Sequence, residues 1–187
     1  MQSGPAQRAA AGDASIVKLA VSPREDFRNV IRRLDDVSIP HTRVSASNLR
    51  FAILELINNS IRAQREKGDD REIQTVFTIA DGRLEVSVRD FGGGFDPRAL
   101  PYDLFSDPAT VDLHSAPFEA YQRKNRYKRF GMGLYIARKT FDSIQIQFVD
   151  NSGRPTSWDQ GRVAGTVINL SAKVDKTDAR REAANER

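Results

Sequence analysis

Three polar side chains interrupt an otherwise apolar helical pattern between Ser45 and Arg65. At about 100° per residue, Glu55, Asn59 and Arg62 follow the spacing i, i+4 and i+7 and share one face. The apolar residues of the same stretch gather on another face, which is typical of a helix packed on a core. A carboxylate, a carboxamide and a guanidinium therefore line up on one face of a helix whose apolar face is expected to pack on the core. Such a row is either a solvated row of ion pairs or one wall of a ligand site.

A carboxylate followed by glycines stands at the end of a predicted strand, in the segment DFGGGFDP that begins at Asp90. Gly92 and Gly94 would let the backbone pass close to a flat ligand. The carboxylate can accept a hydrogen bond from an exocyclic amine. Adenine offers that amine, whereas guanine has a carbonyl at the matching position. The segment is equally compatible with a plain glycine-rich turn.

A second glycine pair, in Gly131-Met132-Gly133-Leu134, opens another predicted helix. Free backbone N–H groups at a helix start suit a phosphate, although this short motif is also common at ordinary loop-to-helix junctions. The preceding residues 95–130 lack convincing periodicity, although residues 118–123 could form a helical turn or two. Their first half carries prolines and aspartates, and their second half is basic up to Arg129. The charge distribution indicates a mobile flap with one end for anions.

Periodicity predicts helices over residues 27–34, 45–67 and 131–141, with strands over 15–21, 73–79, 84–90, 144–149 and 163–172. Pro23 stands where the first helix can begin, Ser45 or Ser47 is the expected N-cap of the second, and Gly68 is its expected stop. Asp81-Gly82 predicts a hairpin. The element order predicts an α+β fold: a two-layer α/β sandwich whose mixed, mostly antiparallel sheet is covered by helices on one face.

Composition fits one soluble globular domain: the chain has 187 residues, of which 39% are hydrophobic and 29% charged. We expect a disordered arm over 1–13, a folded domain over 14–172 and a charged tail over 173–187. The absence of cysteine excludes disulfides and thiolate chemistry. A net charge of +4 is too small to indicate a nucleic-acid partner. No apolar run is long enough for a membrane segment, and the first residues lack a secretory signal, so we expect cytoplasmic localisation.

The order of the motifs resembles one superfamily, the histidine-kinase-like ATPases with the Bergerat fold (GHKL). In that group a helix with E-x-x-x-N is followed by a strand ending in D-x-G-x-G. A long lid, a helix opened by G-x-G-L and a G-T pair on a strand come after it. The resemblance covers roughly residues 14–172 and implies ATP and Mg²⁺ (magnesium) as cofactors. It also identifies residues 95–130, called the lid segment below, as the ATP lid.

Residue by residue, the resemblance implies that Asn59 binds Mg²⁺, that Glu55 is the general base and that Arg62 contacts phosphate. Asp90 corresponds to the adenine-reading carboxylate. Further nucleotide contacts are implied for Gly92, Gly94, Arg129, Gly131, Met132, Gly133, Leu134 and Thr166.

Two branches of the superfamily compete. The G-F-D-P segment and the opening strand-helix unit resemble the anti-sigma-factor serine/threonine kinases. Their partner would be a sigma factor, an anti-anti-sigma factor or a response-regulator-like protein, and a homodimer is compatible with this branch. Arg62 is more similar to sensor histidine kinases, but residues 1–44 cannot build their phosphoacceptor hairpin. His41 and His114 stand in irregular segments, where we expect no acceptor. A nucleotide-gated binding module without phosphoryl transfer is the third possibility.

Overall fold

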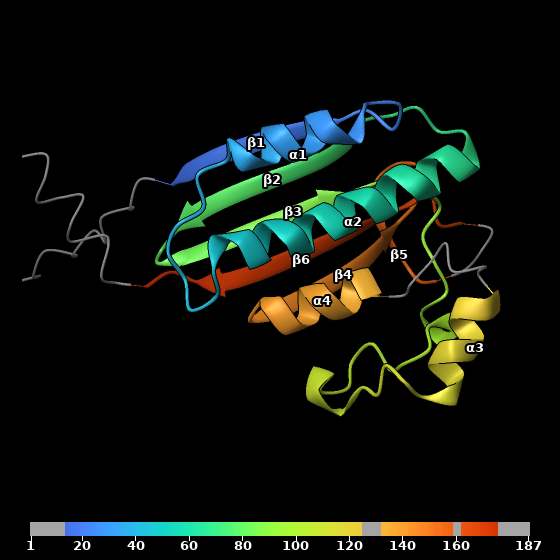
Figure 1. Cartoon of the computed structure of the whole chain (residues 1–187). Coiled ribbons are helices and arrows are strands. Elements are labelled where there is room, and N and C mark those ends of the chain that lie inside the picture. Colours follow the sequence, from blue (N-terminus) through green and yellow to red (C-terminus); the bar gives the residue numbers. More distant parts are fainter. Residues whose placement is uncertain (1–13, 125–131, 159–161, 176–187) are drawn as a thin grey trace, which may run out of the picture.

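A six-stranded sheet in the order β1-β2-β3-β6-β4-β5 forms one layer, and every neighbouring pair in it is antiparallel (Figure 1). The computed structural model describes residues 14–124, 132–158 and 162–175. The strands are β1 Ser15–Val21, β2 Ile73–Ala80, β3 Arg83–Arg89, β4 Ser143–Val149, β5 Pro155–Thr156 and β6 Gly165–Lys173. Three helices lie over one face of the sheet: α1 Phe27–Asp35, α2 Ala46–Lys67 and α4 Met132–Thr140. The predicted two-layer α+β architecture is confirmed.

The strand register places apolar residues in a continuous row beneath the helices. Val17 faces Phe77, Phe77 faces Val86, Val86 faces Leu170 and Leu170 faces Ile144. Phe77, Val86 and Leu170 are at most 2% exposed. Since side chains alternate between the two faces of a strand, this register commits one face of each strand to the core.

Helix α2 crosses the centre of this layer, and its sequence fixes both of its ends. The Ser45 side chain accepts a hydrogen bond from the Asn48 backbone N–H, so Ser45 and not Ser47 is the N-cap. Gly68 ends the helix in the left-handed conformation, with φ of 72°. Leu49, Ile53 and Ile57 are fully buried, as the apolar periodicity predicts. The helix is therefore fixed at both termini and along one face.

Several predicted boundaries differ from the structure. Helix α1 begins at Phe27, later than Pro23, because the Asp26 side chain caps it by accepting from the Arg28 N–H. Strand β6 begins at Gly165, two positions later than predicted. The short strand β5 lies in a region where the sequence predicts no strand. Lys173 still belongs to β6, in a region assigned to the tail. The predicted arm 1–13 and residues 176–187 of the tail lie outside the described residues.

The described part of the lid segment, residues 95–124, has more structure than its sequence indicates. It contains the 3-10 turns η1 Pro97–Ala99 and η2 Pro108–Thr110 and the helix α3 Ala116–Lys124. Leu104 is 4% exposed and Phe118 is 1% exposed. The Arg138 guanidinium of α4 donates to the Leu104 carbonyl. Local periodicity is weak here because single side chains, and not a continuous apolar face, anchor the segment.

Within the parts of the chain that the structure describes, no helix combines the length and apolarity that a membrane crossing requires.

Truncating the buried face of α2 should destabilise the whole domain. Ile57 is fully buried, so Ile57→Ala should lower the free energy of unfolding by about 2–5 kcal/mol in urea denaturation. Phe51 on the same helix is 52% exposed, and Phe51→Ala should change that free energy by about 0.5 kcal/mol or less. Equal losses for the two variants would contradict the packing of α2 described above.

Candidate functional site

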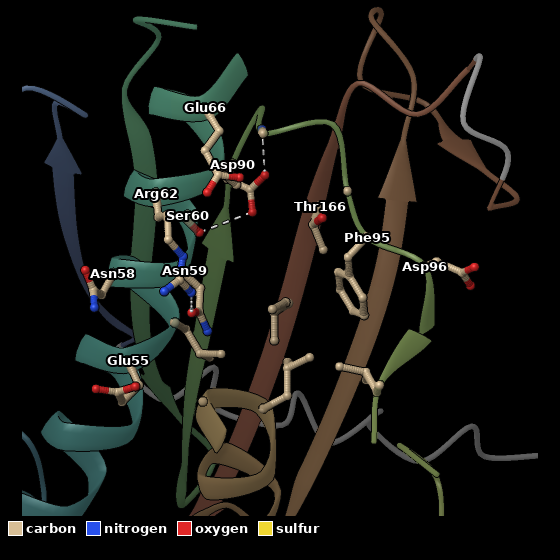
Figure 2. Close-up of a pocket in the computed structure, with 18 of the residues that line it drawn as sticks. Glu55, Asn58, Asn59, Ser60, Arg62, Glu66, Asp90, Phe95, Asp96 and Thr166 are labelled. Carbon is tan, nitrogen blue, oxygen red and sulfur yellow. Dashed lines mark hydrogen bonds between the residues drawn. The ribbon is translucent and has the colours of Figure 1, made fainter. Parts of the chain in front are cut away.

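A cavity of about 730 Å³ lies between α2, the turn after β3, the start of α4 and strand β6 (Figure 2). Its volume lies within the usual range for small-molecule sites. The residues singled out from the sequence line this one cavity, except for two that lie outside the described residues, Arg129 and Gly131. The lining members are Glu55, Asn59, Arg62, Asp90, Gly92, Gly94, Met132, Gly133, Leu134 and Thr166.

Asp90 is a buried carboxylate on the wall of the cavity, with 8% of its surface exposed. The Ser60 hydroxyl donates to its Oδ2 at 3.1 Å, and the Gly92 backbone N–H donates to its Oδ1 at 2.9 Å. Burial raises the pKa of Asp90, and these hydrogen bonds and the charge of Lys67 oppose the rise. Each carboxylate oxygen has a second lone-pair direction. The group can therefore accept a further hydrogen bond from a ligand amine.

The glycines after Asp90 serve two different purposes. Gly93 and Gly94 have φ of +86° and +72°, which only glycine adopts without strain. Gly92 has an ordinary φ, but a Cβ there would lie 2.4 Å from the Cβ of Ala63 on α2. The sequence predicts that Gly92 makes room for a ligand. In the structure Gly92 lines the cavity, and its backbone also lies against Ala63 of helix α2.

The G-T pair of β6 meets the same turn from the other side. A Cβ on Gly165 would lie 2.0 Å from the Asp90 carbonyl oxygen, so no larger residue fits without moving the backbone. The Asp90 N–H donates to the Thr166 carbonyl at 2.9 Å. Thr166 is 3% exposed and lines the cavity. The sequence places Gly165 in the G-T pair, but the reason for a glycine there, its contact with the Asp90 carbonyl, appears only where β6 pairs with β3.

The polar row of α2 faces the start of α4. Arg62 Nη2 donates to Asn59 Oδ1 at 2.5 Å, which orients the carboxamide (Figure 2). A Cβ on Gly133 would lie 2.4 Å from Asn59 Nδ2 and 3.6 Å from the Glu55 Cβ. Gly133 therefore allows α4 to approach the row, and the row is a cavity wall rather than a solvated surface.

Further lining residues extend the predicted set. Glu66 continues the row of α2 by one turn from Arg62, a spacing that could have identified it from the sequence. Tyr121 and Lys124 reach the cavity from α3, one turn apart. Phe95 also lines the cavity and packs edge-on against Phe148, with 5.5 Å between ring centroids. These last contacts depend on the packing of the lid segment, which the sequence does not reveal.

The oxygen donors of the cavity suit magnesium with few protein ligands. In the part of the chain that is described, no group of three or more His, Asp or Glu side chains could hold a metal by itself. Asn59 and Glu55 nevertheless line the same cavity. Mg²⁺ prefers oxygen ligands and commonly takes one or two from the protein, with phosphate and water completing its shell. The residues present fit that mode of binding.

Comparisons with known proteins agree with this geometry. Residues 19–156 match the family model described as histidine kinase-like ATPase domain. Serine-protein kinase RsbW of Bacillus pumilus is 24% identical over 143 residues, covering 74% of this chain and 80% of the relative. The same-named protein of Bacillus subtilis is 22% identical, covering 72% and 79%. That of Listeria monocytogenes is 25% identical over 101 residues, covering 54% of this chain and 57% of the relative.

The raised pKa of Asp90 predicts a pH-dependent stability. The folded protein keeps this proton to higher pH than the unfolded chain, whose aspartate pKa is about 4. The resulting stabilisation is full below that value and is lost as the pH rises through the folded-state pKa. Asp90→Asn cannot titrate. It should therefore gain stability relative to the wild type as the pH is raised from about 4 to neutrality, as measured by urea unfolding.

Asp150→Asn provides a control of opposite sign. Hydrogen bonds from Ser152 and Arg154 lower the pKa of Asp150. Its stabilisation is therefore present above the unfolded pKa and is lost as the pH falls. Asp150→Asn should lose stability relative to the wild type as the pH rises through the acid range. A pH-independent difference between the wild type and Asp90→Asn would contradict the buried state of that carboxylate.

Proposed function

The chain belongs to the histidine kinase-like ATPase family, and from this premise we propose that it binds Mg-ATP in the cavity and transfers the γ-phosphoryl group to a serine or threonine of a protein partner. The relatives named serine-protein kinase support the hydroxyl acceptor. The partner would be a sigma factor or an anti-anti-sigma factor.

One observation carries the proposal: a single cavity joins a buried carboxylate at one end to the polar row of α2 at the other (Figure 2). Asp90 lies beside Ser60 and accepts from it. Glu55 lies toward the opposite end of the drawn part of the helix. An adenine at Asp90 would therefore extend its phosphates along α2 toward Asn59, Arg62 and Glu55.

Each end of the cavity has the chemistry that its part of the nucleotide requires. Asp90 accepts from the exocyclic amine of adenine and repels the carbonyl of guanine. Asn59 would hold Mg²⁺, which neutralises phosphate charge when it is bound. Arg62 orients the Asn59 carboxamide and places a cation at the same wall. Glu55 would accept the proton of the attacking hydroxyl.

The lid segment adds charge from the opposite wall. Lys124 lines the cavity at the end of α3, and the buried Phe118 and Leu104 anchor this part of the chain. A lysine there would stabilise the charge on transferring phosphates. Because the segment packs through a few side chains only, it can reposition α3 at small cost when a nucleotide enters.

The described residues 14–40 favour a serine kinase over a histidine kinase. Strand β1 pairs with β2 over its whole length, and α1 buries Val30 and Leu34 against the same core. This part of the chain is thus integrated in the ATP-binding layer. Within the described residues 14–40, no separate helical hairpin with a phosphoacceptor histidine is formed.

Adenine selectivity should depend on Asp90. Asp90→Asn removes a charged acceptor and turns a donor toward the adenine amine. The loss of one charge-assisted hydrogen bond is worth roughly 1.5–3 kcal/mol, or about tenfold to over a hundredfold in ATP affinity. Calorimetric titration of the wild type and the variant with ATP and with GTP measures this loss. Equal affinity for both nucleotides, unchanged by the substitution, would refute the adenine assignment.

Phosphoryl transfer should depend on Glu55. Glu55→Gln keeps the size of the side chain and should leave ATP affinity within a few fold. The transfer rate should fall by about 10²–10⁴, the usual range for a positioned base. The assay incubates the protein with radiolabelled ATP and the partner that co-purifies with it in the presence of ATP. Glu85→Gln is the control, because Glu85 lies on the exposed face of β3 away from the cavity.

The chemistry of the labelled product separates the alternatives. Acid-stable label that is lost in Glu55→Gln supports transfer to a hydroxyl, since phosphoserine and phosphothreonine survive acid. Acid-labile label would move the protein to the histidine-kinase branch. ATP-dependent partner binding without any label would leave a nucleotide-gated binding module.

A further inference from the structure

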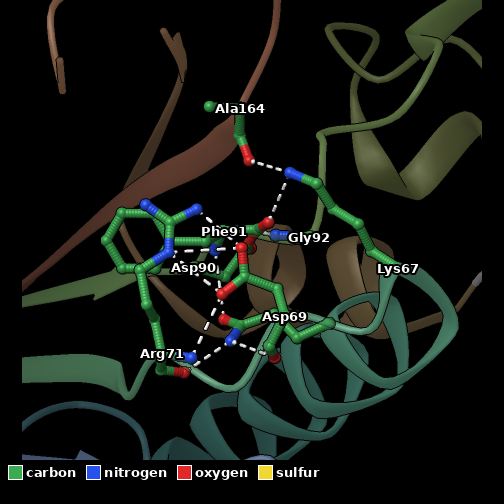
Figure 3. A network of polar contacts seen from close by, with 8 residues as sticks. Lys67, Asp69, Arg71, Asp90, Phe91, Gly92 and Ala164 are labelled. Carbon is green, nitrogen blue, oxygen red and sulfur yellow. Dashed lines mark hydrogen bonds and ion pairs between the residues drawn. The ribbon is translucent and has the colours of Figure 1, made fainter. Parts of the chain in front are cut away.

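A second polar row on α2 contacts the turn that carries Asp90, and Figure 3 shows the contacts around Lys67 and Phe91. Ser60, Gln64 and Lys67 follow the spacing i, i+4 and i+7 and so share a face. Ser60 donates directly to the Asp90 carboxylate at 3.1 Å. Gln64 and Lys67 do not bond that carboxylate. They bond instead to the backbone of Phe91, the residue after Asp90: Gln64 to its N–H and Lys67 to its carbonyl.

Gln64 is fully buried, and its carboxamide joins two segments that are far apart in the sequence. Its Oε1 accepts from the Phe91 N–H at 3.0 Å. Its Nε2 donates to the Arg71 carbonyl at 2.6 Å and to the Asp69 carbonyl at 3.3 Å. The turn after β3 is thereby tied to the connection between α2 and β2. A buried amide that uses both of its ends in this way fixes the distance between the segments it joins.

Lys67 bonds the carbonyl of Phe91, the residue whose N–H is bonded to Gln64. Its Nζ donates to the Phe91 carbonyl at 2.9 Å and to the Ala164 carbonyl at 3.0 Å. The Ala164 carbonyl also accepts from the Gly93 N–H at 3.0 Å. Lys67 therefore bridges helix α2, the turn and the chain entering β6. Both polar backbone groups of Phe91, the residue that follows Asp90, are held from α2.

The Phe91 ring is held as well. The Arg71 guanidinium lies 3.9 Å from the ring centroid, a cation–π distance. Asp69 pairs with Arg71 at 2.6 Å, and this hydrogen bond lowers the pKa of Asp69 to about 2. Arg71 thus stays charged and oriented over the ring. Backbone and side chain of Phe91 are both restrained, so the adjacent carboxylate has little freedom to move.

We infer that Gln64 and Lys67 are positioning residues that set the base selectivity of the site by fixing where the Asp90 carboxylate lies. A hydrogen bond weakens steeply once its distance or angle leaves the preferred range. A turn that could shift by a fraction of an ångström would discriminate adenine from guanine poorly. This inference rests on the proposed role of Asp90 in reading adenine.

Lys67→Met is the decisive variant, because Lys67 is exposed at the helix end and its loss leaves the core intact. We expect the ratio of ATP affinity to GTP affinity to fall roughly tenfold, the value of about one hydrogen bond. Lys67→Arg keeps the charge and the donors and should restore most of the ratio. Gln64→Met should lower the ratio similarly, and it should also lower stability because the Phe91 N–H and the Arg71 carbonyl lose their partner. Calorimetric titration with ATP and GTP measures the ratio, and urea unfolding reports the stability of each variant.

Arg65→Met is the matched control. Arg65 carries the same charge on the same turn of α2, but it donates to the Pro23 and Glu25 carbonyls, away from the Asp90 turn. Its loss should leave the ATP-to-GTP ratio unchanged. If Lys67→Met lowers both affinities by the same factor, Lys67 acts only as a positive charge and the inference is wrong. If the wild type itself does not prefer ATP, the proposed adenine site fails first.

Discussion

The site depends on keeping one carboxylate buried at the end of a strand. Asp90 is 8% exposed, and burial alone disfavours its charged form. Donors from α2 and from its own turn offset part of that cost. Asp90 also lines the cavity. A buried carboxylate that already accepts some hydrogen bonds and can accept another is suited to a ligand with a hydrogen-bond donor.

Helix α2 meets this requirement because its 22 residues present three different faces. One face, with Leu49, Ile53 and Ile57, packs on the sheet. The row Glu55, Asn59 and Arg62 lines the cavity, and the row Ser60, Gln64 and Lys67 holds the turn that carries Asp90. Because a single rigid helix carries all three, the distance between the two ends of the cavity is set by core packing.

The parts that could be predicted from the sequence are those coded by local spacing. Apolar periodicity identified all the described strands but β5 and all the described α-helices but α3. Residue types with known backbone preferences identified Ser45, Gly68 and the Asp81-Gly82 turn. The row from Glu55 to Arg62 was also visible, because its members are neighbours on one helix. Gln64 could not be identified in this way, since its carboxamide bonds Phe91, which lies on another element. The contact between Gly92 and Ala63 could not be predicted for the same reason: only the folded chain brings Ala63 beside it.

Gln64 and Lys67, the two residues proposed to position Asp90, differ in how much they also contribute to the stability of the fold. An apolar residue at position 64 would remove the partner of the half-buried Phe91 N–H and Arg71 carbonyl, at a cost of about 1 kcal/mol each. Gln64 is therefore constrained by folding whether or not a nucleotide binds. Lys67 bonds carbonyls at an exposed helix end, where water can replace it at little cost to folding. Water can satisfy those carbonyls, but it cannot hold the turn and the β6 entrance at a fixed separation. Position 67 is thus where nucleotide preference can change with little effect on the fold.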